Sequence, residues 1–232
     1  MSPDPRLAGA PIEPAMSVAD TNEDTIIVNA FGERFLTAAK RVLQLEGGWV
    51  NDPKDRGGET KYGISLRFLV HEGKVDFDRD GVADFDLDMD GDIDGADIRL
   101  LTRNDALNLY QRCFWKRLDA DSFPVPIGEM LFDQAVNGGL LAARKMLQRA
   151  INASIDVMRP AHRFEPLKVD GVIGARTRQA LDRVIEQLGR RAIVLGYRRA
   201  AENRYRAIVA RYPEQRRFLR GWLARAAELG TE

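Results

Sequence analysis

The sequence lacks the features that mark disulfide-bonded, secreted or membrane-spanning proteins. Of its 232 residues only Cys113 is a cysteine, so no disulfide can form within the chain, which fits a reducing compartment. No run of 18 apolar residues occurs, so we expect no transmembrane helix. The first 29 residues lack a basic start followed by an apolar run, so we expect no secretory signal peptide. Cys113 lies in an amphipathic helix pattern, which favours packing over catalysis for its thiol.

Strand patterns are also scarce. No apolar–polar alternation persists over more than a few residues, whereas apolar residues recur at helical spacing along most of the chain. We therefore predict a mainly α protein, with a small β-hairpin possible in residues 48–64 and a flexible tail over residues 1–28. The expected helices are 31–45, 66–72, 102–118, 127–137, 140–152, 175–188, 190–211 and 213–229, with a loop over 153–173.

The net charge of zero conceals two segments of opposite sign. Residues 74–97 contain ten Asp against Lys74 and Arg79, whereas residues 140–232 contain twenty Lys and Arg against nine Asp and Glu. The basic segment is consistent with solvated helix faces or with attraction to an anionic polymer or surface. Charge alone does not choose between nucleic acid and a bacterial envelope.

Residues 46–65 concentrate glycine, proline and acidic side chains directly after an apolar helix. The helix 31–45 is expected to end at Glu46, because two glycines follow and glycine is common just past a helix C-terminus. Residues 47–65 hold five glycines, a proline and three further acids, which indicates an exposed loop that carries functional groups. Burial beside a partly negative helix end would raise the pKa of Glu46, as a general acid requires. The alternative is an ordinary exposed helix-end carboxylate.

The acidic segment contains a twelve-residue pattern of the EF-hand calcium loop, and it resembles the dockerin-like variant that ends in Asp. Such loops place oxygen ligands at positions 1, 3, 5, 7, 9 and 12 and glycine at position 6. The residues at those positions are Asp86, Asp88, Asp90, the carbonyl of Asp92, Asp94 and Asp97, with Gly91 sixth. We therefore predict a bound Ca²⁺ that braces the fold, with a disordered acidic linker as the alternative.

An upstream run repeats this pattern incompletely and gives a second candidate calcium loop. Its candidate ligands are Asp76, Asp78, Asp80, Val82 through its carbonyl, and Asp84. The twelfth position is Leu87, which offers no carboxylate, and Asp86 and Asp88 are already required by the downstream loop. The occupancy of this loop is left open.

The run Glu46-Gly-Gly-Trp-Val-Asn-Asp-Pro-Lys-Asp-Arg-Gly-Gly-Glu-Thr-Lys-Tyr-Gly-Ile-Ser65 closely resembles the N-acetylmuramidases of glycoside hydrolase family 108, which include phage endolysins. Later segments resemble the peptidoglycan-binding segment usually attached to them; these are 132–139, 147–152, 169–174 and 218–225. The resemblance implies a lysozyme-like helical fold. It also implies a muramidase region over 29–120, interrupted by the insert 74–97, and a helical peptidoglycan-binding segment over 121–232.

The resemblance implies cleavage of the β-1,4 bond between N-acetylmuramic acid and N-acetylglucosamine, with Glu46 as the catalytic acid. Asp55 and Thr60 are the candidate helpers, because phage-type lysozymes carry a similar Glu–Asp–Thr arrangement, one residue longer at the Thr. Asp55 is equally consistent with a hydrogen-bonded turn. The candidate substrate-binding residues are Trp49, Tyr62, Gln134 and Asn137. For Trp49 and Tyr62 packing is the alternative, and for the two amides it is a satisfied internal hydrogen bond.

The expected partner is bacterial peptidoglycan, with the basic C-terminal helices engaging an anionic outer envelope and with no nucleic acid. We expect a monomer with no organic cofactor, made in the host cytoplasm and reaching the cell wall after holin-type release. Two other functions compete with this one. A non-catalytic peptidoglycan-binding module is disfavoured by the presence of Glu46, Asp55 and Thr60. A calcium sensor is disfavoured by the position of the acidic loops inside an enzyme-like scaffold.

Overall fold

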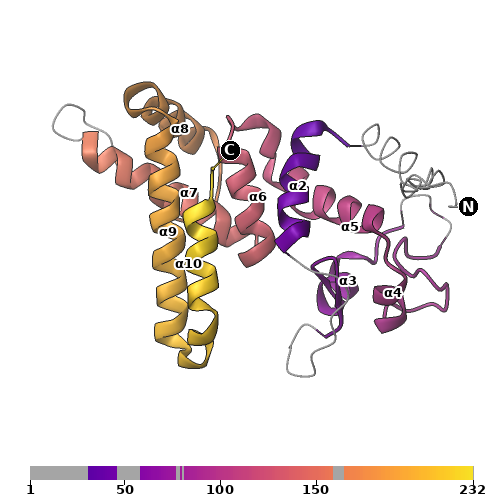
Figure 1. Cartoon of the computed structure of the whole chain (residues 1–232). Helices are drawn as coiled ribbons and strands as arrows, with labels where there is room; N and C mark the ends of the chain where they lie inside the picture. Colours follow the sequence, from indigo (N-terminus) through magenta and orange to yellow (C-terminus); the bar gives the residue numbers. More distant parts are fainter. Residues whose placement is uncertain (1–30, 46–57, 77–78, 80, 159–164, 232) are drawn as a thin grey trace, which may run out of the picture.

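The computed structural model describes residues 31–45, 58–76, 79, 81–158 and 165–231, and most of them are helical (Figure 1). The predictions for the N-terminal tail and for Glu46, Trp49, Asp55, Asp78 and Asp80 lie outside the described residues. Helices α2 and α3 span Glu33–Leu45 and Leu66–Glu72, α4 and α5 span Gly95–Leu100 and Arg103–Tyr110, and α6 and α7 span Ile127–Gly138 and Leu140–Met158. Helices α8, α9 and α10 span Ala175–Leu188, Arg190–Arg211 and Leu219–Glu228.

A small antiparallel hairpin and three short irregular helices complete these elements. Strands β1 (Thr60–Lys61) and β2 (Ile64–Ser65) pair Thr60 with Ser65 and Lys61 with Ile64. The short segments are a π-helical turn η1 (Gln111–Lys116) and the 3₁₀ turns η2 (Ala120–Ser122) and η3 (Pro213–Phe218). The prediction of a mainly α chain with a small hairpin is confirmed.

Local sequence signals set several helix ends as predicted. The hydroxyl of Ser65 accepts a hydrogen bond from the N–H of Phe68 and caps α3. Gly73 follows α3, and a side chain there would lie 2.6 Å from the carbonyl oxygen of Leu69. Thr102 and Asp105 form the expected capping box at the start of α5. Helix α6 also ends at the glycine pair that the sequence marked.

Two predicted boundaries are wrong. Helix α7 continues to Met158, six residues past the predicted end at Asn152 and into the predicted loop. Its apolar spacing continues there, with Ile155 and Met158 buried, and the hydroxyl of Ser154 is satisfied by the carbonyl of Ala150. The expected last helix, 213–229, is divided into the 3₁₀ turn η3 and the α-helix α10.

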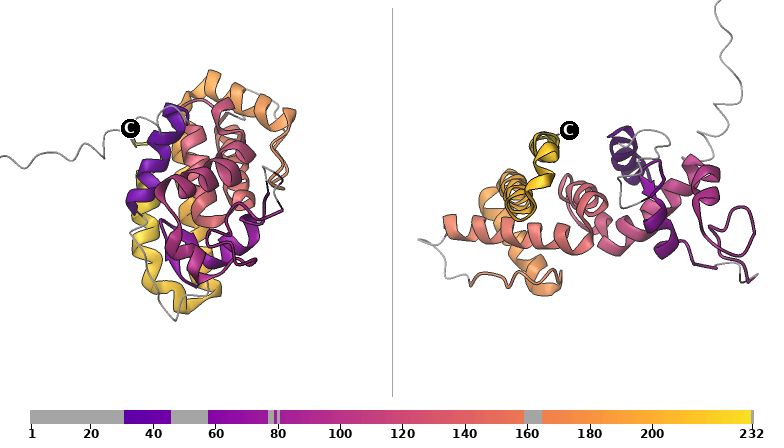
Figure 2. Two further views of the ribbon diagram at one scale, coloured as in Figure 1. Left: turned by 90° about the vertical axis from the view of Figure 1, so that its right-hand side faces the viewer. Right: turned by 90° about the horizontal axis from the view of Figure 1, so that it is seen from below.

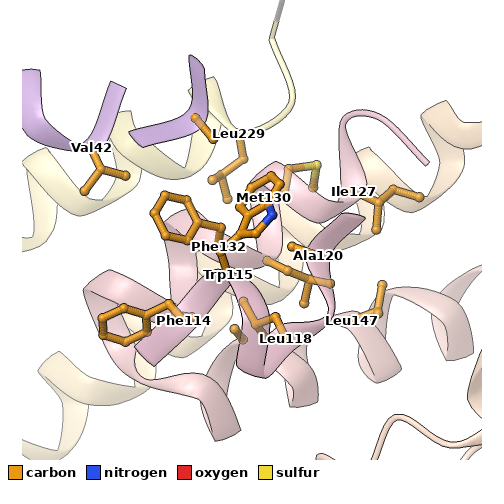
Figure 3. Packing of buried hydrophobic residues seen from close by; sticks show 14 of the residues in the cluster. Val42, Phe114, Trp115, Leu118, Ala120, Ile127, Met130, Phe132, Leu147 and Leu229 are labelled. Atoms are coloured by element: carbon orange, nitrogen blue, oxygen red, sulfur yellow. The ribbon is translucent and has the colours of Figure 1, made fainter. Parts of the chain in front are cut away.

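The core between α2, η1 and α6 contains a cluster of three aromatic rings, each of which contacts the other two. Trp115 meets Phe132 edge-on at 5.5 Å between ring centroids (Figure 3). Phe35 meets Trp115 and Phe132 edge-on at 5.6 and 5.8 Å. The indole N–H of Trp115 donates to Asp121, so its burial leaves no polar group unpaired. Cys113 lies beside this core, and burial raises the pKa of its thiol to about 11. The thiol is therefore protonated at neutral pH, in line with a packing role.

Helix α6 joins the two halves of the molecule. It packs against α2 on one side and α7 on the other, and α7 packs in turn along α8 and α9. Helices α9 and α10 lie side by side as a hairpin away from α3 and α4 (Figures 1 and 2). None of the described helices is both long enough and apolar enough to cross a membrane.

Candidate active site and acidic loop

Helices α2 and α6 run in the same direction. Near the start of both helices, the guanidinium of Arg34 donates to both carboxylate oxygens of Glu129, at 2.6 and 2.9 Å. Hydrogen bonding to Glu129 raises the pKa of Arg34 above its usual value. The C-terminal ends of α2 and α6 therefore lie at the same end of the molecule (Figure 1). Glu46 is the next residue after α2 in the chain, and its own position lies outside the described residues.

The hairpin carries the predicted residues Thr60 and Tyr62. Thr60 begins β1 and is half-buried, with its hydroxyl 3.5 Å from the carbonyl oxygen of Gly58. Tyr62 stands in the turn with a φ of 51°, a left-handed conformation that Gly63 also adopts. The backbone carbonyl of Tyr62 accepts a hydrogen bond from the hydroxyl of Tyr110 on α5 at 2.8 Å. Tyr62 thus fixes the hairpin onto the helical body, and its ring also packs against the core.

The amides of Gln134 and Asn137 have internal partners. Gln134 is 1% exposed, and its side chain accepts from the hydroxyl of Tyr205 at 2.9 Å and donates to Asp133 at 3.0 Å. Asn137 donates to the same hydroxyl at 2.6 Å. The hydrogen bonds to Tyr205 join α6 to α9. They give the two amides partners within the protein, which is the alternative to sugar binding that the sequence left open. Sequence reasoning missed Tyr205, because a tyrosine 68 residues from its amide partner leaves no local signal.

Replacing Tyr205 by phenylalanine is expected to lower the free energy of unfolding by about 1–3 kcal/mol, because the buried amide of Gln134 and the half-buried amide of Asn137 lose their shared partner. Urea unfolding of the purified chain measures this change. Tyr212→Phe is the matched control, since Tyr212 is 46% exposed. Equal stability of the two variants would show that the network contributes nothing.

A second polar link between the two halves is an ion pair that was not predicted from the sequence. The Nε atom of Arg225 on α10 donates to Asp133 on α6 at 3.1 Å, and both side chains are largely buried. A cavity of about 450 Å³ opens beside this pair, between α2, α6 and the C-terminal segment. Its lining includes Ala38, Met130 and Leu229, and none of Thr60, Tyr62, Gln134 or Asn137.

The downstream acidic loop brings the carboxylates of Asp86, Asp88 and Asp97 together, with one oxygen of each within 4.8 Å of the others. Asp86 and Asp97 are only 6% and 1% exposed, which is rare for carboxylates. Asp86 accepts backbone N–H groups from Asp90 and Gly91 at 3.1 and 2.9 Å. Positions 1, 3 and 12 of the predicted calcium loop therefore converge on one point.

The remaining candidate ligands of this loop have other roles in the structure. The carboxylate of Asp90 accepts the N–H of Asp92 at 3.1 Å, and the carboxylate of Asp94 caps α4. Asp97 closes the loop by accepting the N–H groups of Leu87 and Asp94 at 2.6 and 2.7 Å. The charge of Asp90 raises the pKa of Asp92, a direct sign of like-charge crowding.

The upstream loop repeats part of this geometry in the residues that the structure describes. Asp76 accepts the N–H of Gly81 at 3.0 Å, as Asp86 does from Gly91. The fourth and sixth positions have positive φ in both loops, at Arg79 and Gly81 upstream and at Met89 and Gly91 downstream. Asp84 instead lies 3.8 Å from the guanidinium of Arg112. The repeat is therefore partial, in agreement with the missing twelfth ligand.

The two halves of the chain match two family models. Residues 39–139 match the model described as Glycosyl hydrolase 108, a range that runs from α2 through the hairpin and acidic loops to the end of α6. The chain carries a glycosyl hydrolase 108 domain. Residues 142–227 of this hydrolase match the model described as Predicted Peptidoglycan domain. Together the two domains identify a glycoside hydrolase that acts on peptidoglycan.

Comparison with solved structures supports the fold of this hydrolase. The structure of Brucella abortus SagA superimposes with a TM-score of 0.57 and 23% sequence identity, covering 85% of this chain and 96% of that one. At this identity the likeness concerns the fold alone, and it agrees with the lysozyme-like helical fold expected from the sequence. A search of curated proteins finds no match.

Proposed function

We propose that the hydrolase is an N-acetylmuramidase, which cleaves the β-1,4 bond between N-acetylmuramic acid and N-acetylglucosamine with Glu46 as general acid. The observation that carries this proposal is the glycosyl hydrolase 108 match over residues 39–139, which includes Glu46 and the residues that follow it in the sequence. The match to a peptidoglycan domain in the following residues supports peptidoglycan as the polymer that is cleaved.

The chemistry of the bond explains why one carboxylic acid is indispensable. A glycosidic oxygen leaves poorly until it is protonated, so the enzyme needs a carboxyl group that still holds its proton near neutral pH. Lysozyme is the standard example of a glutamic acid tuned in this way. We assign a supporting role to Asp55 and Thr60. They would orient the attacking water or stabilise the positively charged sugar in the transition state.

The products of digestion test this function. Mass spectrometry of borohydride-reduced muropeptides separates the three classes of peptidoglycan hydrolase, because the sugar or amide at the new end differs among them. A muramidase leaves N-acetylmuramic acid at the reducing end, a glucosaminidase leaves N-acetylglucosamine, and an amidase leaves no new reducing end.

We further propose that the loop Asp86–Asp97 binds one Ca²⁺ as a structural ion. The converging oxygens of Asp86, Asp88 and Asp97 fit a hard cation that prefers oxygen ligands. The bound ion would neutralise the crowded carboxylates and so fix the start of α4, which the loop residue Asp94 caps. The chemistry of hydrolysis stays with the protein side chains, so the ion is a brace for the fold.

The site of action in this proposal is the cell wall, since the partner domain is a peptidoglycan domain. Delivery during phage-type lysis through a holin, and attraction of the arginine-rich helices α9 and α10 to an anionic envelope, complete the proposed role.

A further inference from the structure

The hairpin that carries Thr60 and Tyr62 is too small to hold its own position. Each strand has two residues, and an isolated two-stranded hairpin is marginally stable even when longer. Its turn is tied to α5 through Tyr110, and Ile64 is buried in the core. At the opposite end of the hairpin, the carbonyl of Glu59, the residue before β1, accepts the N–H of Leu66 at 2.8 Å, and the side chain of Glu59 adds a separate support.

That support comes from α4, which lies next to the hairpin in space and follows the acidic loop in sequence. One guanidinium nitrogen of Arg99 on α4 donates to both carboxylate oxygens of Glu59, at 2.9 and 3.0 Å. In the reverse direction, the ammonium of Lys61 donates to the backbone carbonyl of Arg99. Two contacts therefore join β1 and the residue before it to a single residue of α4.

The start of α4 is shaped to receive the Glu59 carboxylate. Gly95 is its first residue, and a side chain there would lie 3.3 Å from the carboxyl carbon and from one carboxylate oxygen of Glu59. A side chain at residue 95 would therefore require the Glu59 carboxylate and the Arg99 guanidinium, which is equally close, to shift slightly. Ile98, on the same short helix, is fully buried, so α4 is a fixed point against which the hairpin can be held.

We propose that Glu59 and Arg99 are positioning residues for glycan hydrolysis, which hold the hairpin that carries Thr60 in a fixed position on the helical body. This inference rests on the proposed muramidase function, because it assigns Thr60 and Tyr62 to the substrate side of the site. Arg99 is half exposed, and an exposed ion pair adds little to global stability. Its loss therefore changes the position of the hairpin and leaves overall stability almost unchanged.

The test is a double-substitution cycle with Glu59→Gln, Arg99→Gln and the double variant. Each single variant is expected to lower kcat roughly tenfold with a smaller change in KM, because small misplacement of catalytic groups slows the chemical step. The double variant is expected to be no slower than the slower single variant. Arg99→Lys, which keeps the charge, is expected to recover part of the rate.

The matched control is Arg117→Gln. Arg117 donates to both oxygens of Glu72 at 3.1 and 3.0 Å and is as exposed as Arg99, but its partner is the last residue of α3 and not a residue of the hairpin. We expect this variant to keep the wild-type kcat. Rates of Glu59→Gln and Arg99→Gln that equal that of Arg117→Gln, or losses that add in the double variant, would overturn the proposal.

Amide hydrogen exchange separates this inference from the proposed function. We call the contacts of Glu59 and Lys61 with Arg99 the clasp. In Glu59→Gln and Arg99→Gln, the amides of Lys61 and Ile64 are expected to exchange faster while the amides of α7 and α9 keep their protection. Unchanged exchange in the hairpin would reject the clasp whatever the activity. A wild-type chain that releases no sugar reducing ends would reject the muramidase function, and the exchange result would still decide whether the clasp holds the hairpin.

Discussion

Replacing Glu46 by glutamine is expected to abolish the clearing of a peptidoglycan suspension. Glutamine keeps the size of the side chain but cannot donate a carboxyl proton to the glycosidic oxygen. General acid catalysis contributes about 100-fold to 10,000-fold to such reactions, so the rate of turbidity loss should fall at least about 100-fold. Circular dichroism and melting temperature should stay close to wild type, because the amide replaces the acid without changing its shape.

Glu33→Gln is the matched control for this substitution. Glu33 lies exposed in the first turn of α2, the helix that precedes Glu46 in the sequence, so its substitution removes the same charge elsewhere in the same part of the chain. We expect this variant to clear the suspension at the wild-type rate. Full activity in Glu46→Gln would reject Glu46 as the general acid. An equal loss of activity in both variants would show that the effect comes from removing a negative charge and not from removing the acid.

Removing calcium is expected to lower the melting temperature substantially. A ligand present at 100 times its dissociation constant stabilises the folded state by about 2.7 kcal/mol. For a chain of this size, that free energy corresponds to a shift of roughly 5–10 °C. Differential scanning calorimetry of EDTA-treated protein, before and after adding back Ca²⁺, measures the shift, and titration calorimetry measures binding directly.

Asp88→Ala connects this effect to the downstream loop. Asp88 is exposed and belongs to the converging trio, so its loss should remove most of the calcium-dependent shift while changing the metal-free protein little. Asp182→Ala, an exposed substitution on α8, should retain the full shift. No heat of calcium binding and no shift in the wild-type chain would reject the calcium site.

Local chemistry explains which parts of the fold the sequence could predict. Ser65 and Gly73 bound α3 through hydrogen bonding and steric space within a few residues, so their effect is readable from the chain alone. The capping box at Thr102 has the same local character. Helix α7 extends past its predicted end because the hydroxyl of Ser154 bonds back to the carbonyl of Ala150 and the buried apolar spacing continues to Met158.

Long-range polar contacts were beyond the reach of sequence reasoning. Asp133 pairs with Arg225, which lies 92 residues away, and Glu59 pairs with Arg99, 40 residues away. Nothing in the spacing of such residues identifies their partners, since tertiary packing alone brings them together. The acidic loop could be predicted because its pattern is local, within twelve consecutive residues. In the structure, the carboxylate of Asp86 accepts the N–H of Gly91, and the carboxylate of Asp97 accepts the N–H of Leu87.

The identity of the sugar at the newly formed end of the glycan tests the central claim most directly. Purified peptidoglycan is digested with the wild-type chain, reduced with borohydride and analysed by tandem mass spectrometry. The muramidase function predicts that the reduced sugar is N-acetylmuramic acid, which carries the stem peptide, and that the products are absent with Glu46→Gln. A reduced N-acetylglucosamine, or a cleaved amide without a new reducing end, would contradict it.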